Sequence, residues 1–377
     1  MKADTISAFL QERIDANDFP SAIYLVAEKG EIIFQDALGF AVVEPKRIAA
    51  TSDTVYDLAS LTKPLVTGLL TAKLIENGEL DPNAAVGDLL PEFYVSSNAE
   101  ITVNQLAMHT SGLPAWRPFY LLVEHPDEII GEISRTLQHI DQEPVTYSDL
   151  NFLTLAAIIE YLTGSDLSSV TENKIISPLK LNNTSFNPLT KFSSERIAAS
   201  EKGNEYEKQT CVEMGYLAED APARPAGILF RNYQIWGEVH DGNAWFMRGA
   251  AGHAGLFSNT EDVFKIALQF LPNYTTILKP ETGELFKTNF STSLNEDRSF
   301  SFQLASTQGS TAGTQMPPES FGHNGFTGTS LWIDPVNERI FVLLTNRTHF
   351  HSLPFVNINS VRRRFHDLAI GLLDSNI

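Results

Sequence analysis

Cysteine is almost missing from this 377-residue chain, in which Cys211 is the only one. A single thiol cannot form an intrachain disulfide. Together with nine histidines it also gives no cluster with the spacing of metal ligands. We therefore expect no disulfide, no metal site and no cofactor, and a chemistry that the side chains supply themselves.

Long apolar runs are missing as well. The uncharged run FPSAIYLVA at 19–27 is too short to cross a bilayer, which takes about 20 apolar residues. The N-terminus, MKADTISAFLQERIDAND, is charged and amphipathic, unlike the basic and then apolar segments of a signal peptide. These features predict a soluble, cytoplasmic protein, an expectation that holds only if no leader precedes Met1.

Positive charge is scarce relative to negative charge. The chain has 27 Lys and Arg against 46 Asp and Glu, a formal net charge of -19. Such a field repels polyanions, which excludes nucleic acids and anionic membranes as expected partners. Small anions meet the same repulsion, although salt screens it beyond about 8 Å. The composition, 43% hydrophobic and 19% charged, is otherwise that of a globular protein. It does not predict an oligomeric state.

The order of patterns along the chain predicts an α+β fold. A helical pattern at 3–15 precedes two strand patterns, SAIYLVA and EIIFQDALGF, and TSLWIDP and RIFVLLTN lie near the other end before a final helical pattern. Mostly helical patterns lie between them. We predict an antiparallel sheet flanked by terminal helices, formed by residues 1–64 and 290–377, with a helical domain of residues 65–289 inserted. Residues 187–245 have weak periodicity and are expected to form long loops. The cleft at the junction is the expected site.

A serine and a lysine three positions apart stand in DLASLTKPLV, residues 57–66. Pro64 is tolerated only near the start of a helix, so Ser60 lies at that start and Lys63 one turn further on. A lysine can activate a serine hydroxyl as a nucleophile. The spacing alone is weak, because Ser177 and Lys180 repeat it without evident chemistry.

Two further motifs supply partners for such a pair. Tyr147 in PVTYSDLNFLTL is the only one of ten tyrosines followed two positions later by Asp or Asn, although Ser148 or Asp149 could simply cap the next helix. In FGHNGFTGTSLWIDP, His323 stands before a strand whose small residues allow a ligand close to the backbone. A second HxG, at His253, precedes a helical pattern and is expected to hold a tight loop.

Taken in order, SLTK at 60–63, YSD at 147–149 and HNG at 323–325 resemble the serine β-lactamase and penicillin-binding-protein superfamily. The most similar branch is the class C-like one of esterases and D-aminopeptidase-type hydrolases. Stretches such as TVNQLAMHTSGLP, AGHAGLFSNTEDV and GHNGFTGTSLWIDP extend the resemblance over about residues 20–350.

The resemblance implies a role for each matching position. Ser60 is the expected nucleophile, and Lys63 and Tyr147 share the proton transfers, with the general base left open between them. The backbone amides of Ser60 and Phe326 are the expected oxyanion hole, worth about 3 kcal/mol per donor. Expected substrate-binding residues are Asp149, His323, Asn324 and Gly325. His240 and Asp241 could line the cleft or form a surface turn, and residues 362–364, three arginines, are expected on a solvated helix face.

Two departures from the β-lactamase pattern bear on the substrate. Asp149 stands where an asparagine is common, and its carboxylate could pair with Lys63 and shift the base role toward Tyr147. His323 stands where a lysine is common and is mostly neutral at pH 7, so a permanent cation for a substrate carboxylate is missing. We therefore expect a serine hydrolase that acts through a Ser60 acyl-enzyme on small esters or amides. The alternatives are a D-aminopeptidase or carboxypeptidase acting on peptidoglycan-type fragments, a weak β-lactamase, and a sensor that acylates without turnover.

Overall fold

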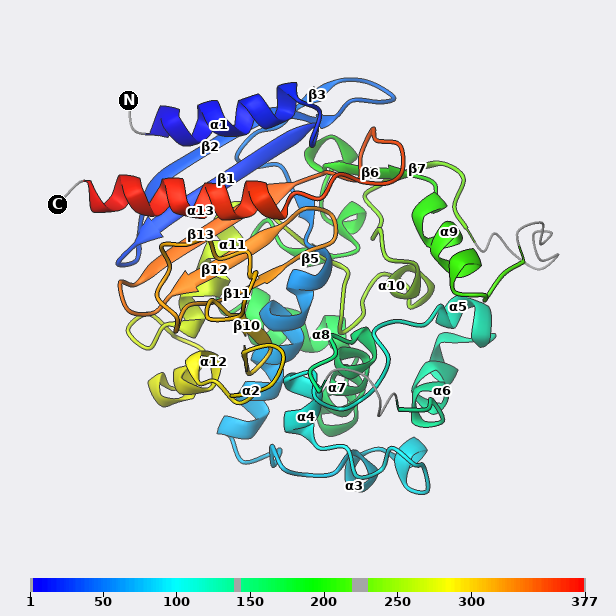
Figure 1. Ribbon diagram of the computed structural model, residues 1–377. Helices are drawn as coiled ribbons and strands as arrows, with labels where there is room; N and C mark the ends of the chain where they lie inside the picture. The colour runs from blue at the N-terminus through cyan, green and yellow to red at the C-terminus, as the bar shows by residue number, and fades with distance from the viewer. Residues whose placement is uncertain (1–2, 139–143, 219–229, 376–377) are drawn as a thin grey trace.

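An eight-stranded antiparallel sheet runs through the computed structural model, which describes residues 3–138, 144–218 and 230–375 (Figure 1). Strands from both ends of the chain meet in it, as expected for the predicted α+β fold, which is confirmed. Its strands in spatial order are β3 (Ile48–Ala49), β2 (Glu31–Val42), β1 (Ser21–Glu28), β13 (Arg339–Thr345), β12 (Ser330–Asp334), β11 (Phe321–Asn324), β10 (Phe302–Leu304) and β9 (Arg298–Ser299).

The central strands β1 and β13 are buried along nearly their whole length and apolar between their ends, because both faces of the sheet are covered. Alternate side chains of these strands enter two different clusters. Ile23 and Leu25 pack into the larger cluster, whereas Tyr24 and Val26 pack on the opposite face. The sheet therefore separates two hydrophobic layers.

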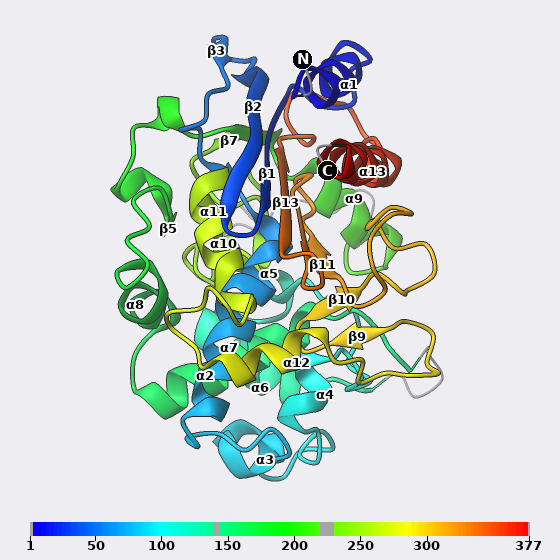
Figure 2. The ribbon, with the colours of Figure 1, turned by 90° about the vertical axis from the view of Figure 1, so that its left-hand side faces the viewer.

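The terminal helices cover one face of the sheet side by side, and α11 covers the other face against β1 and β13 (Figure 2). Ile6 of α1 and Phe365 of α13 are fully buried in the smaller cluster. The helices are α1 (Ala3–Asp15), α2 (Leu69–Glu76), α3 (Val86–Leu89), α4 (Val103–Ala107), α5 (Phe119–Leu122), α6 (Ile129–Ser134), α7 (Asp149–Thr163), α8 (Leu167–Thr171), α9 (Glu205–Glu213), α10 (Gly242–Phe246), α11 (Thr260–Ala267), α12 (Glu284–Lys287) and α13 (Asn359–Asp374).

The helical part between the chain ends shares the larger cluster with the sheet, so one continuous core joins them. Helix α11 falls within the predicted insertion but packs on the sheet, and the boundaries at 64/65 and 289/290 remain a prediction. Within the stretch 187–245, which we expected to be loops, the described residues form α9, α10 and a small sheet of β6 (Ala199–Lys202) and β7 (Gln234–Trp236). A third sheet joins β4 (Tyr56–Asp57), β8 (Leu256–Ser258) and β5 (Ser185–Phe186).

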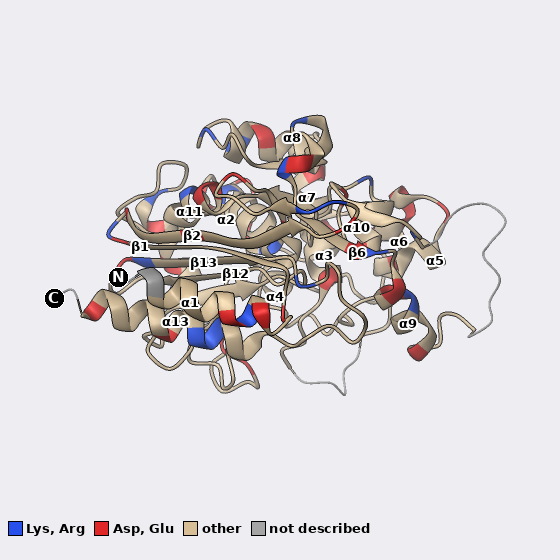
Figure 3. Cartoon of the chain, turned by 90° about the horizontal axis from the view of Figure 1, so that it is seen from above, with Lys and Arg blue, Asp and Glu red and all other residues tan. Residues whose placement is uncertain are grey.

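Charged residues are interspersed along the outer helices, while the central strands carry few of them (Figure 3). Within the described ranges, no helix combines the length and the apolar character that a membrane span requires.

Candidate active site

Ser60 lies in a strained turn at the start of a helix. The 3-10 turn Ala59–Leu61 leads into the π-helical segment Lys63–Gly68, with Pro64 in its first turn. Ala59 has a positive φ of 47°, which is costly for a residue with a Cβ, and its N–H donates to Asp57 Oδ1 at 2.9 Å. As the second residue of the turn, Ser60 has an N–H without an intrahelical acceptor. The turn thus presents both a hydroxyl and an amide.

Lys63 is fully buried beside this hydroxyl. Its Nζ donates to Ser60 Oγ at 3.0 Å and to the carbonyl of His253 at 3.3 Å, and lies 2.7 Å from Asp149 Oδ1. The ion pair expected from the sequence is therefore present. Burial acts to lower the pKa of Lys63, but Asp149 and Tyr147 outweigh it, so the pKa is raised. The resting lysine is an ammonium.

Tyr147 places its ring against two cations. Lys63 Nζ lies 4.8 Å and the Arg298 guanidinium 5.5 Å from the ring centroid. The hydroxyl is buried and makes no hydrogen bond of normal geometry within the described residues, but Lys63 and Ser60 lie close enough to favour its ionised form. Burial raises the pKa of Tyr147, and Lys63 opposes this rise. Loss of a proton from Tyr147 thus depends on the neighbouring cations.

The segment that carries Tyr147 is held by the HTSGLP loop. His109 has a positive φ of 59° and is fully buried. Its Nδ1 accepts the N–H of Ser148 at 3.0 Å, and its carbonyl accepts the N–H of Thr146 at 2.9 Å. Burial and nearby cations lower the pKa of His109 well below its usual value, which keeps Nδ1 an acceptor. His109 therefore holds the segment that carries Tyr147 in place.

The HNG turn after β11 is fastened to the turn that carries Ser60. Thr327 donates to the carbonyl of Asp57 at 2.7 Å, and Thr329 donates to that of Leu58 at 2.9 Å. A Cβ on Gly325 would lie 2.5 Å from the Leu58 carbonyl, so only glycine allows this approach. Within the described residues, the N–H of Phe326 donates no hydrogen bond. The two amides expected to form the oxyanion hole therefore belong to turns that are held together.

His323 is a neutral acceptor at this site. Its Nδ1 lies 2.9 Å from the carbonyl of Asn324, which can only accept, so the proton is on Nδ1. Its Nε2 is buried without a partner among the described residues, and its ring centroid lies 5.7 Å from that of Tyr147. Burial, together with Lys63 and Arg298, lowers the pKa of His323 well below its usual value. His323 can accept a hydrogen bond but cannot supply a cation. The Asn324 side chain accepts from Thr311 Oγ1 at 3.0 Å.

A cavity of about 340 Å³ on one side of Ser60 is lined by three arginines. We call this cavity the arginine cavity. Our expectation that no permanent cation is available for a carboxylate is therefore wrong. The expectation that Arg362 lies on a solvated face is also wrong, since it is only 6% exposed. The lining comprises Ser60, Tyr147, Arg298, Gln303, His323, Asn324, Gly325, Phe326, Arg347, Asn359 and Arg362.

Two of these arginines have no carboxylate partner among the described residues. Arg347 donates to the carbonyls of Phe326 and Val356, both at 2.7 Å. Arg362 donates to the carbonyl of Gly325 at 2.8 Å, and its Nε has no partner there. Burial and the charge of Arg347 lower the pKa of Arg362 to about 9. Arg362 is buried and Arg347 partly buried, and cations without a counter-charge in such surroundings favour an anionic ligand.

A second cavity, of about 540 Å³, also contains Ser60, Tyr147 and Phe326 in its lining. Here the charged residues are acidic and the rest of the wall is largely aromatic or aliphatic. We call it the acidic cavity. Of the two alternatives for His240 and Asp241, a place in the cleft and a surface turn, the structure shows the first, because both line this cavity. The lining comprises Ala59, Ser60, Pro114, Ala115, Trp116, Tyr147, Asp149, Tyr206, Glu207, Thr210, Met214, His240, Asp241, Ala254 and Phe326.

His240 and Glu207 are fixed within the wall of the acidic cavity. His240 Nε2 lies 2.7 Å from Glu201 Oε2, and its ring stacks on Phe326 at 5.3 Å between centroids. Glu207 accepts the N–H of Gly242 at 2.7 Å, and burial raises its pKa to about 7. Sequence reasoning missed Glu207 because no motif surrounds it.

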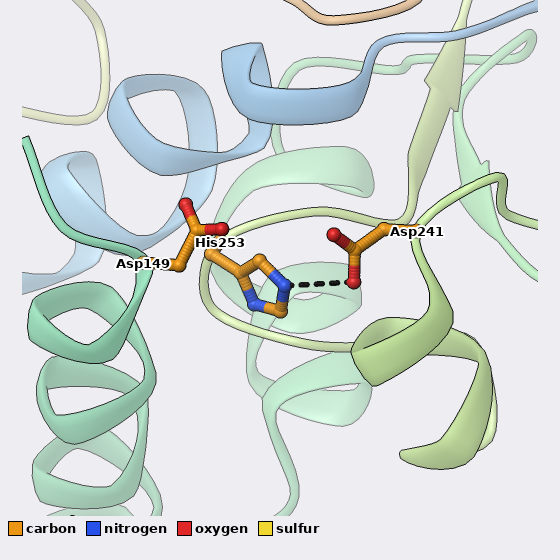
Figure 4. A group of neighbouring side chains, drawn as sticks. All are labelled: Asp149, Asp241 and His253. Atoms are coloured by element: carbon orange, nitrogen blue, oxygen red, sulfur yellow. Dashed lines mark hydrogen bonds and ion pairs between the residues drawn. The ribbon is translucent and has the colours of Figure 1, made fainter. Parts of the chain in front are cut away.

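Asp149, Asp241 and His253 converge in the described structure, with one possible metal-ligand atom of each within 4.8 Å of the others (Figure 4). His253 Nε2 lies 2.9 Å from Asp241 Oδ1, and Lys63 lies against Asp149. Both carboxylates thus already have protein partners, which makes the group a charge cluster rather than an open metal site. His253, which the sequence assigned only to a tight loop, thus belongs to this cluster.

A family model described as Beta-lactamase matches residues 6–361. A protein of Escherichia coli (strain K12) named "Putative D-alanyl-D-alanine carboxypeptidase" is 32% identical over 384 residues, which cover 92% of this chain and 83% of that protein. A protein of the same name from Salmonella agona (strain SL483) is 32% identical with the same coverage.

Solved structures share the fold at low sequence identity. A penicillin-binding protein homologue from Caulobacter crescentus superposes with a TM-score of 0.72 at 17% identity, over 98% of this chain and 97% of that one. EstCE1, described as a hydrolase with promiscuous acyltransferase activity, superposes with a TM-score of 0.71 at 19% identity, over 97% and 98% of the two chains.

Proposed function

Because the chain belongs to the β-lactamase family of serine hydrolases, we propose that it cleaves amide bonds in small peptides that end in a free carboxylate. The arginine cavity beside Ser60 carries this proposal. Three guanidiniums line it, and Arg347 and Arg362 have no carboxylate partner among the described residues. The name of the relatives, a carboxypeptidase, supports the same substrate class.

In the proposed reaction, Ser60 Oγ attacks the carbonyl carbon of the scissile amide. Its proton passes to the base formed by Lys63 and Tyr147, and the amides of Ser60 and Phe326 stabilise the oxyanion. The proton then goes to the leaving amine, which departs with its carboxylate in the arginine cavity. Water attacks the acyl-enzyme, again with loss of a proton to the base, and the acid is released.

The base is best assigned to Tyr147 acting under the charge of Lys63. Lys63 rests as an ammonium against Asp149, 2.7 Å away, so it must first lose a proton to act as the acceptor. Burial raises the pKa of Tyr147, so its hydroxyl also rests protonated, and the Lys63 ammonium beside it favours the ionised form that can accept the Ser60 proton. The Nε2 atom of His323 is a suitable acceptor for a substrate N–H or for Tyr147.

Ester hydrolysis is the second candidate, favoured by the apolar wall of the acidic cavity. Trp116, Tyr206 and Met214 could hold an apolar acyl group there. An ester with a neutral leaving group would not use the arginine cavity. The relative activity on the two substrate types therefore distinguishes the candidates.

A substrate panel tests the proposal. We expect peptides with a free C-terminal carboxylate to be cleaved faster than p-nitrophenyl esters and a chromogenic cephalosporin, and Ser60→Ala to abolish each activity. A fluorophosphonate should add one label to the wild-type protein and none to Ser60→Ala. Activity that survives this substitution would show that another residue is the nucleophile. A protein that is labelled at Ser60 but never hydrolyses its acyl-enzyme would be a sensor. Fractionation of cells tests the predicted cytoplasmic location.

A further inference from the structure

His253 lies between two carboxylates next to the lysine that contacts Ser60 (Figure 4). It is 1% exposed and comes from the loop before β8. Its Nε2 hydrogen bonds to Asp241 Oδ1 at 2.9 Å, and its own carbonyl accepts from Lys63 Nζ at 3.3 Å. The same residue therefore contacts both ends of the cluster.

Asp241 is held rigidly for this contact. Its Oδ1 also accepts the N–H of Ala244 at 2.8 Å, as the cap of α10. Burial acts to raise the pKa of Asp241, but His253 outweighs it and holds the pKa below its usual range. An ionised Asp241 only accepts, so Nε2 of His253 is the donor.

The charges of the cluster balance only if His253 is protonated. The titratable groups that face it are Asp241, Asp149 and Lys63, two carboxylates and one ammonium. Burial and Lys63 act to lower the pKa of His253, and the two carboxylates outweigh them and raise it. Cations and anions then alternate in the order Lys63, Asp149, His253, Asp241.

We propose that His253, held as an imidazolium by Asp241, is a positioning residue that sets the pH at which Ser60 becomes nucleophilic. The inference rests on the proposed acylation of Ser60. A positive charge near the site favours loss of a proton from Lys63 and from Tyr147 alike, so the direction of the effect is the same whichever is the base. Without the imidazolium, Asp149 and Asp241 would hold the Lys63 proton more strongly.

The test is the pH dependence of fluorophosphonate labelling in His253→Gln. Two unit charges roughly 6 Å apart, at an effective dielectric constant of about 20, shift a pKa by about one to two units. We therefore expect the rising limb of the labelling rate to move upward by about that amount. His366→Gln is the matched control, because His366 is equally buried but packs against Trp332, Phe341 and Phe365 and makes no contact with Asp149 or Asp241, and burial lowers its pKa to about 3. Its profile should follow the wild type.

If the wild type is labelled and His253→Gln shows the same pH dependence of the labelling rate, this inference is overturned and the proposed function remains intact. A wild type that is not labelled overturns the proposed function and the role of His253 with it. An NMR titration of the imidazole of His253 gives an independent answer. We expect an imidazolium at pH 7 that loses its proton at lower pH in Asp241→Asn, whereas a neutral ring at pH 6 would overturn the proposal. Activation by added Zn²⁺ would also overturn it, since the three groups would then serve a metal.

Discussion

Arg298→Gln should separate recognition of a substrate carboxylate from the general activity of the site. Glu296 Oε2 occupies Nε and Nη2 of Arg298, at 3.0 and 2.9 Å, and leaves Nη1 buried without a partner among the described residues. A hydrogen bond to a charged group contributes about 1.5–3 kcal/mol. Because about 1.4 kcal/mol corresponds to a tenfold change in kcat/KM, the value for a peptide with a free carboxylate should fall about 10- to 100-fold.

The assay compares an acylated dipeptide with its C-terminal amide. Arg298 also lies 5.5 Å from the ring of Tyr147, so its loss can lower both activities, but only the carboxylate interaction changes their ratio. Arg339→Gln is the matched control, because this buried arginine pairs instead with Glu28 and Asp374. It should cost stability and leave the ratio at the wild-type value. An equal loss on both substrates in Arg298→Gln would refute the reasoning.

Asp149→Asn should lower the pKa of Lys63. The pH at which the rate of fluorophosphonate labelling rises should then fall by about one unit or more, opposite to the shift expected for His253→Gln. A pH profile of labelling that does not move would contradict the predicted fall in the pKa of Lys63. The same substitution should lower the free energy of unfolding by about 3 kcal/mol, because Lys63 loses its buried counter-charge. Burial raises the pKa of Glu207 from 4.5 to about 7. Between these two pH values, the folded state keeps a proton on Glu207 that the unfolded state has lost. Stability should therefore fall as pH rises through this window, and Glu207→Gln should be more stable than wild type by up to about 3 kcal/mol at pH 8 but not at pH 4. Urea denaturation of the wild type and of Glu207→Gln at pH 4 and pH 8 measures the difference in stability. The same difference at both pH values would contradict the prediction.

The parts of the fold that the sequence predicts are those in which local pattern and tertiary environment agree. RIFVLLT, with five apolar residues between Arg339 and Thr345, forms β13 because helices cover both faces of the sheet. The helical spacing at 3–15 places Ile6 and Leu10 in the core of α1. Residues 187–245 lack such a pattern, and their short helices depend on contacts that the sequence does not display, such as the hydrogen bond between Glu207 and Gly242.

The arginines of the site escape sequence reasoning for a different reason. Residues 362–364, three arginines in a row, are typical of a solvated helix face. Yet a helix turns by about 100° per residue, so one member of the run can point inward. Arg362 does so and donates to the carbonyl of Gly325. Arg298 reaches Tyr147 only because β9 ends the sheet near the YSD segment. No spacing along the chain encodes either approach.

The net charge of the chain is a poor guide to its substrate, for reasons of distance. The formal charge of -19 of the whole chain repels an anion from afar, but salt screens that field beyond about 8 Å. Within the arginine cavity the nearest charges are guanidiniums, and their low-dielectric surroundings strengthen the attraction. The acidic cavity on the other side of Ser60 disfavours the same anion. If the proposed function holds, the two cavities give a peptide one favoured orientation, with its carboxylate in the arginine cavity and its last amide bond toward Ser60.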